Sequence, residues 1–297
     1  MSRNRVSLLA AGVLAAAVLV ALQACSNPAE PSTAASPSGA ASSPAATAAS
    51  SASAAAASES EEPDAKRDTE TLKNDTGKTL IKSLGTKFGK HISFAVVSSK
   101  GTVVVADPNT IPFTHGFIKA DIITSTFVNH DHKDSYFLQY NPDARVSEMK
   151  PESFAVKDVK VTGIAASHTG DPIDANAPTD VIYVYEVDGL RIAYFAGLDQ
   201  ERLTEDQLKQ LGAIDIALLA FKDAPAWHVK KEASIMILNA LKPRLVLPTE
   251  FDAKTAEEIR KAANVTDGGE ADQLAVSRED LKAMNGTRSI FLRALLD

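Results

Sequence analysis

The chain has 297 residues, of which 44% are hydrophobic and 23% charged, and its formal net charge is -7 at pH 7. This acidic balance argues against nucleic acid or an anionic lipid surface as the main partner, because both would repel it. A single cysteine, Cys25, excludes a disulfide within the chain and leaves that residue for another role.

The first 24 residues have the pattern of a secretory signal. Arg3 and Arg5 precede an apolar run over residues 6–22, which is typical of a cleaved signal peptide rather than of a spanning helix. The segment LQAC at 22–25 resembles a bacterial lipobox, which implies that Cys25 is lipidated and becomes the new N-terminus. The alternative is an uncleaved anchor. Either way, we expect the rest of the protein to be held at the cell membrane and to face outside the cytoplasm.

Residues 25–68 consist almost entirely of Ala, Ser, Pro and Thr and include an acidic cluster of Glu59, Glu61 and Glu62. With so few large apolar side chains, this segment cannot bury enough surface to offset the entropy lost on ordering. We therefore expect a disordered tether. Residues 69–297 suit one domain of ordinary size. Loss of the two arginines of the signal lowers the net charge to about -9.

The first elements of this domain are predicted to be strands. Residues 92–98 and 102–106 are β-branched runs on either side of Ser99-Lys100-Gly101, which predicts a hairpin. Residues 122–128 are predicted as a buried strand.

That strand leads into a short loop with His130, His132 and Asp134 in the pattern H-x-H-x-D. The chain has only six histidines, so two of them one residue apart distinguish this loop. Imidazole and carboxylate groups gathered on one loop are ligands of divalent metals. The alternative is a solvated polar loop. We predict a metal site here.

Strands and then helices follow. Residues 156–165 predict one or two strands that end near His168, and residues 181–187 and 190–195 flank Asp188-Gly189, a strong hairpin signal. Thr204 and Gln207 form a capping box that opens a helix with Leu208 and Leu211 facing inward, closed by Gly212. Further on we predict strands at 214–221 and 244–247 and helices at 231–241, 252–263 and 277–284. We expect Trp227-His228 to be partly buried packing with an exposed ring; the alternative is that it lines the pocket.

Hairpins early in the domain and alternating units late suggest two packed sheets with helices outside. Six ordered segments resemble the metallo-β-lactamase superfamily, specifically its lactonase-like Zn-dependent hydrolase branch. They are HISF (91–94), VVADP (104–108), the H-x-H-x-D loop, SHTG (167–170), YEVDGLRIA (185–193) and LKPRLVLP (241–248). The resemblance implies an α+β four-layer αββα sandwich, the metallo-β-lactamase fold, over residues 69–297.

The resemblance also implies metal ligands. His130, His132 and His168 match the three imidazoles of the first metal in the family. The second set keeps only Asp134, because Ser135 replaces the histidine beside it. Glu250, in place of the final histidine, and Asp199, one residue beyond the bridging aspartate, are the candidate substitutes. We therefore predict one tightly held ion and at most a weakly held second one at a partly degenerate site. The ion is Zn²⁺ or, because carboxylates favour harder metals, Mn²⁺.

Two functions follow from these patterns. The first is a membrane-anchored extracytoplasmic metal-dependent hydrolase of a small ester, lactone or phosphoester, in which Asp134 assists a metal-bound hydroxide. The alternative is a catalytically degenerate lipoprotein of the cell envelope that binds a ligand or a protein. A small-molecule substrate is the expected partner of the first, and nucleic acid is excluded for both. The sequence carries no signal for the oligomeric state.

Overall fold

The computed structural model describes residues 72–85, 92–109, 118–128, 132–170, 173–195 and 198–294, all within one compact unit that spans residues 60–297. The signal at 1–24, the tether at 25–68 with Cys25, and the predicted ligand His130 lie outside the described residues. Within those described ranges, no helix is long and apolar enough to cross a membrane.

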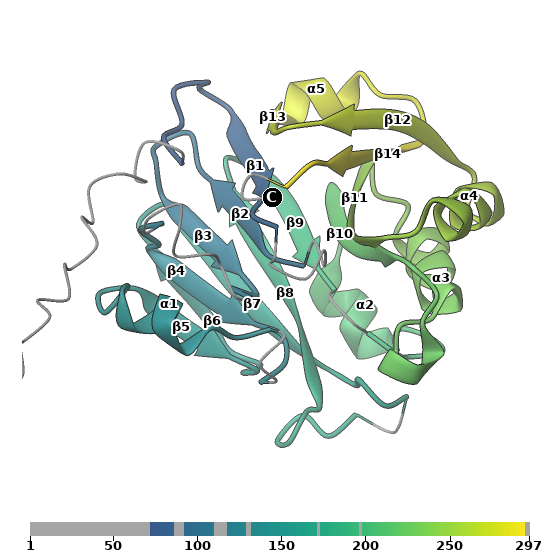
Figure 1. Cartoon of the computed structure of the whole chain (residues 1–297), viewed down its shortest axis with the longest axis horizontal. Helices are drawn as coiled ribbons and strands as arrows, with labels where there is room; N and C mark the ends of the chain where they lie inside the picture. Colours follow the sequence, from purple (N-terminus) through teal and green to yellow (C-terminus); the bar gives the residue numbers. More distant parts are fainter. Residues whose placement is uncertain are drawn as a thin grey trace, which may run out of the picture. The chain divides into compact units, whose positions relative to one another are not determined.

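The described chain forms two sheets (Figure 1). The first has six strands in the order β13 (Leu274–Val276), β1 (Thr79–Ser83), β2 (Phe94–Val97), β3 (Val103–Ala106), β4 (Ile122–Ser125) and β5 (Arg145–Glu148). The second has eight, in the order β12 (Val265–Ala271), β14 (Thr287–Leu292), β11 (Leu245–Phe251), β10 (Ile216–Phe221), β9 (Leu190–Tyr194), β8 (Asp180–Val187), β7 (Val159–Ala166) and β6 (Ser153–Val156).

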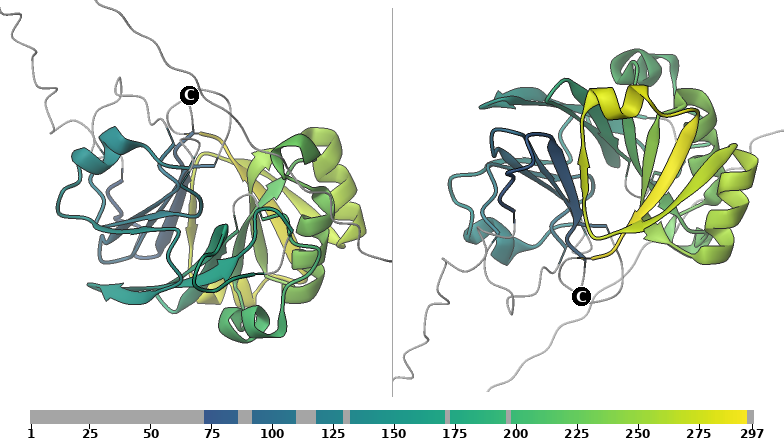
Figure 2. Two further views of the ribbon diagram at one scale, coloured as in Figure 1. Left: turned by 90° about the horizontal axis from the view of Figure 1, so that it is seen from below. Right: turned by 90° about the horizontal axis from the view of Figure 1, so that it is seen from above.

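Helices cover the outer faces of the sheets. Figure 2 shows α2 (Glu205–Leu211), α3 (Lys231–Leu241) and α4 (Ala253–Ala262) on the outer side of the second sheet. The short helix α1 (Ser135–Gln139) packs Phe137 against the outer face of the first sheet. A fifth helix, α5 (Arg278–Lys282), follows β13, and a 3-10 turn, η2 (Pro225–Trp227), precedes α3.

The core follows the two-residue period of the strands. On β2, Phe94 and Val96 face the apolar cluster between the sheets, whereas Ala95 and Val97 face the cluster under α1. Successive side chains of a strand point to opposite faces, so each sheet is covered on both sides. The predicted four-layer αββα sandwich is confirmed.

Parallel pairing brings several strand ends to one edge of the sandwich. β3 runs parallel to β4, and β9, β10 and β11 run parallel to one another. The residues that follow these strands therefore gather together. The backbone N–H of Val181 donates to the carbonyl of Thr126 at 3.1 Å, which links the first sheet to the second at this edge.

Most predicted elements are confirmed, including the hairpin at Asp188-Gly189 and the capping box of Thr204 and Gln207. The inward position of Leu208 is wrong, because this side chain is 36% exposed. Gln207 is buried in its place, where its amide donates to the carbonyl of Ala165 and exchanges hydrogen bonds with Gln200. A satisfied polar side chain thus occupies a face that the pattern assigned to leucine.

Candidate metal centre

A buried aspartate anchors the edge where the candidate residues meet. Asp107 follows β3 with a left-handed φ of 45° and is fully buried. Its Oδ1 accepts from the Thr126 N–H, and its Oδ2 accepts from the Thr126 hydroxyl and from His132 Nδ1, each at 2.7 Å. These contacts fix the loop that follows β4. In the sequence Asp107 was only the end of a strand, so its contact with His132 was missed.

The Asp107 contact determines which nitrogen of His132 remains available. A carboxylate accepts, so we assign the ring hydrogen to Nδ1, which leaves the lone pair of Nε2 for a ligand. Burial lowers the pKa of His132. The Asp107 carboxylate, together with Asp180 and Glu250, raises it by more than burial lowers it, so the pKa lies above its usual value. A carboxylate behind an imidazole is the common support of a metal-binding histidine.

His168 lies beside His132 at the same edge. Its Nδ1 is 4.0 Å from Oδ2 of the buried Asp180, and its backbone N–H donates to the Thr179 hydroxyl at 3.0 Å. The ring of Phe127 stacks on His168 with centroids 4.7 Å apart and meets His132 edge-on at 5.9 Å. Burial raises the pKa of Asp180 well above its usual value, opposed by His132. Two of the predicted ligands are thus brought together.

A third histidine, which was not among the predicted ligands, joins this pair. His228 ends η2 in a left-handed conformation with a φ of 57°. Its ring centroid is 5.2 Å from that of His168, and its Nδ1 donates to Asp199 Oδ2 at 3.3 Å. The neighbouring Trp227 is 69% exposed. His228 therefore contacts residues of the site, which agrees with the alternative that it lines the site and not with the expected packing role. Its left-handed backbone conformation places the ring there.

The predicted catalytic residue Asp134 has a second task. Its Oδ1 accepts from the N–H groups of Tyr136 at 2.9 Å and Phe137 at 3.2 Å, so it is the N-cap of α1. Capping by aspartate is a common way to satisfy the first amides of a helix. The role of Asp134 as metal ligand or base stays a prediction.

The two carboxylates predicted beside a second metal are both held by lysines. Glu250 Oε2 is 2.9 Å from Lys222 Nζ, and Asp199 Oδ1 is 2.8 Å from Lys230 Nζ. Leu198, which precedes Asp199, is buried in the cluster between the second sheet and its helices. This burial leaves Asp199, one residue on, to meet His228.

The donor chemistry fits a metal only in part. His132 and His168 offer imidazoles backed by buried carboxylates, whereas Asp199 and Glu250 are already paired with ammonium groups. In the part of the chain that the structure describes, no group of three or more His, Cys, Asp or Glu side chains is arranged to hold a metal ion. His130, the remaining predicted imidazole, lies outside that part.

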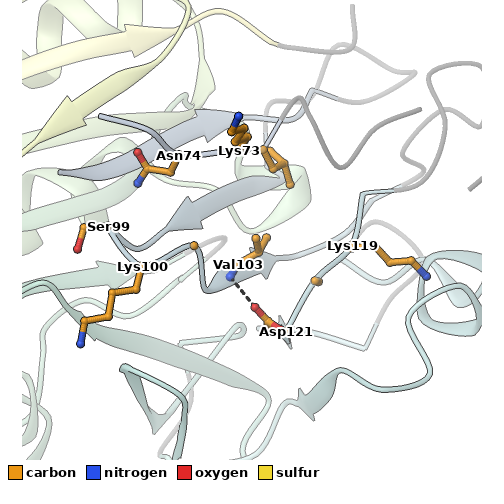
Figure 3. Close-up of a pocket in the computed structure, with 10 residues that line it drawn as sticks. Lys73, Asn74, Ser99, Lys100, Val103, Lys119 and Asp121 are labelled. Carbon is orange, nitrogen blue, oxygen red and sulfur yellow. Dashed lines mark hydrogen bonds between the residues drawn. The ribbon is translucent and has the colours of Figure 1, made fainter. Parts of the chain in front are cut away.

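A cavity of about 550 Å³ lies elsewhere (Figure 3). It is lined in part by Val103, which begins β3, and by Asp121, which precedes β4, so it is at the opposite ends of these strands from Asp107. The Asp121 carboxylate accepts from the N–H of Val103 at 3.0 Å, and the Asn74 amide donates to three backbone carbonyls. The three lysines that line the cavity, Lys73, Lys100 and Lys119, lie apart from one another in Figure 3. This cavity is separate from the histidines.

Comparison with protein families supplies one match. The family described as the beta-lactamase superfamily domain matches residues 86–250. This span includes the strand ends of both sheets that meet at the site. A search of curated proteins finds no match.

Solved structures with a similar fold come from several organisms. One, from Thermotoga maritima and assigned as a Zn-dependent hydrolase of the metallo-β-lactamase superfamily, is 16% identical with a TM-score of 0.50, covering 73% of this chain and 99% of that one. A protein from Parabacteroides distasonis, assigned as a metal-dependent hydrolase, is 22% identical with a TM-score of 0.46, covering 61% and 92%. A metallo hydrolase from Ignicoccus hospitalis is 11% identical with a TM-score of 0.48, covering 74% and 97%. The first of these supports the fold.

Proposed function

Because this chain belongs to the metallo-β-lactamase superfamily, we propose that it is a metal-dependent hydrolase of a small ester, lactone or phosphoester. The observation that carries the proposal is the contact between Asp107 and His132, in which a fully buried carboxylate fixes the imidazole with Nε2 available. Burying a carboxylate costs free energy unless hydrogen-bond partners satisfy its lone pairs. This buried contact orients the imidazole of His132 beside a second histidine.

The residues have distinct tasks in this proposal. His132 and His168, with His130 from the sequence pattern, hold one metal ion through their imidazoles. When bound, such a metal lowers the pKa of a coordinated water and polarises the carbonyl or phosphoryl oxygen under attack. Phe127 stacks on the ring of His168 and meets the ring of His132 edge-on, so one aromatic side chain contacts both described imidazoles. Asp134 Oδ1 is engaged by α1, so we assign to its Oδ2 the task of accepting a proton.

The test uses the full chain, purified in mild detergent without chelator, and measures bound metal by mass spectrometry. We expect about one equivalent of Zn²⁺ or Mn²⁺. We also expect hydrolysis of at least one class among p-nitrophenyl esters, lactones and phosphodiesters, lost on chelation and restored by the metal. A folded chain that holds no metal and takes up neither ion would contradict the proposal.

One observation favours the alternative, a non-catalytic envelope lipoprotein with this fold. Glu250 and Asp199, two of the three carboxylates assigned to the second set, are each paired with a lysine. A site that had lost its chemistry would tolerate such pairs. The metal measurement above separates the two functions, since a binding module has no requirement for an ion.

We further propose that Cys25 anchors the protein in the membrane outside the cytoplasm. The support is the sequence pattern of residues 1–25 and the absence of large apolar side chains from the tether. Cys25→Ser is expected to move the protein from the membrane fraction to the soluble fraction after cell lysis, because one acyl-modified residue carries the attachment. Fractionation with an antibody measures this. A Cys25→Ser chain that stays with the membrane would favour an uncleaved anchor.

A further inference from the structure

Two lysines lie at the metal-site edge of the second sheet. Lys222 follows β10 directly, and Lys230 lies at the start of α3. Because β9, β10 and β11 are parallel neighbours, the residues after β9 and β10 and the end of β11 meet at one edge. Asp199 comes after β9, and Glu250 is the penultimate residue of β11. Lysines and carboxylates therefore alternate along the same edge.

The first pair is short and partly buried. Lys222 Nζ donates to Glu250 Oε2 at 2.9 Å, and the Glu250 side chain is only 14% exposed. Glu250 is the penultimate residue of β11, so it lies at the same strand-end edge as Lys222, which follows the parallel strand β10. The ammonium of Lys222, whose side chain is 34% exposed, is therefore held by Glu250 at the edge of the second sheet that carries the candidate carboxylates.

The second pair uses both oxygens of its carboxylate. Asp199 is 4% exposed; its Oδ1 is 2.8 Å from Lys230 Nζ and its Oδ2 accepts from His228 Nδ1 at 3.3 Å. A divalent metal needs a carboxylate oxygen with a lone pair facing it. Here each oxygen already faces a donor from the protein.

We propose that Lys222 and Lys230 take the place of a second metal ion, supplying fixed positive charge to Glu250 and Asp199 so that the centre accepts one ion only. The inference rests on the proposed function for the first ion and adds which residues limit the site to it. The charges of the two ammonium groups offset those of the two carboxylates. Unlike a bound metal ion, neither ammonium group can dissociate from the protein. A second divalent cation would have to displace both and would meet their repulsion.

The test counts metal ions on the full chain in detergent. Wild type, Lys222→Met/Lys230→Met and Lys231→Met are stripped with chelator, titrated with Zn²⁺ by calorimetry and measured again by mass spectrometry. Methionine keeps an unbranched side chain out to the Cε position and lacks the charged ammonium group. Lys231 is the matched control, because it pairs with Glu258 at 2.7 Å, a carboxylate that belongs to α4 and is not a predicted ligand.

We expect the double lysine variant to bind one equivalent more than wild type and the Lys231→Met variant to match wild type. Lys222→Arg/Lys230→Arg, which keeps both charges, is also expected to match wild type. Equal stoichiometry in wild type and the double methionine variant would overturn the inference. So would two equivalents in wild type.

The two proposals fail in different ways. The proposed function depends on the first equivalent in wild type, whereas this inference depends on the difference between the double variant and wild type. If unpaired carboxylates prevent the double variant from folding, Lys230→Met alone serves, because this lysine is 46% exposed. Its melting temperature is expected to fall, and Zn²⁺ is expected to raise it by more than it raises that of wild type, which gains only the first ion. Equal rises in the two chains would overturn the inference.

Discussion

Replacing His132 by asparagine is expected to lower metal affinity and hydrolysis by more than about 100-fold, since loss of a group that merely supports a ligand already costs about 10–100-fold. The asparagine amide nitrogen can stand where His132 Nδ1 donates to Asp107. The buried carboxylate therefore keeps a partner, while the second nitrogen is gone. The substitution separates loss of a ligand from loss of folding.

The measurements are metal content, the Zn²⁺ dissociation constant and kcat/KM on whichever substrate class the wild type hydrolyses. Circular dichroism and melting temperature verify that the fold is kept. His115→Asn is the control, because this histidine, which lies outside the described residues, is not among the predicted ligands. If His132→Asn kept both the metal and the rate, His132 would not be a ligand.

Asp107→Asn is expected to weaken Zn²⁺ binding by about 10–100-fold while preserving the backbone. Asn is tolerated at a positive φ, so the left-handed conformation at position 107 is kept. An amide N–H placed toward His132 Nδ1 would turn that atom into an acceptor and move the ring hydrogen to Nε2. The nitrogen that faces the metal would then lack its lone pair.

The same variant makes a second prediction about pH. The pKa of His132 is raised above its usual value of 6.5 in the folded chain, with Asp107 as the leading cause of the rise against burial. The stabilisation by this pair is therefore complete below the unfolded pKa and is lost as the pH rises through the folded pKa. Asp107→Asn should lower the pKa of His132 and remove this dependence.

NMR titration of the metal-free chain measures that pKa, and urea denaturation at several pH values measures the stability. Asp188→Asn is the matched control. Asp188 also has a positive φ, 49°, and accepts from Thr79 and Ser99, but it lies at the opposite end of the sandwich from Asp107. Equal effects of the two substitutions would mean that Asp107 acts on the fold alone.

Elements with strong local signals were predictable from the sequence. The turn at Asp188-Gly189 and the capping boxes at Thr204 and Ser277 involve residues no more than a few positions apart. Backbone amides near these side chains are satisfied locally, so the pattern alone predicts the structure. The resemblance to the superfamily supplied the order of the layers, which local signals do not contain.

Elements with weaker patterns were missed. The strand β12 carries the sequence VTDGGEA and is mostly exposed, so it lacks the alternation of a half-buried strand. It exists because β14 offers it a parallel edge. β1 was likewise missed, although its five residues are all buried between β13 and β2.

In the sequence, the H-x-H-x-D spacing brought forward His130, His132 and Asp134 as candidates, because residue type and local spacing select metal-binding chemistry. The resemblance to the superfamily added the sandwich class and the candidates His168, Asp199 and Glu250. Only the tertiary structure decided their partners. Asp107 reaches His132 across 25 positions, and Lys222 reaches Glu250 across 28. These contacts depend on which strands run parallel and end at the same edge, and strand order is a property of the whole fold.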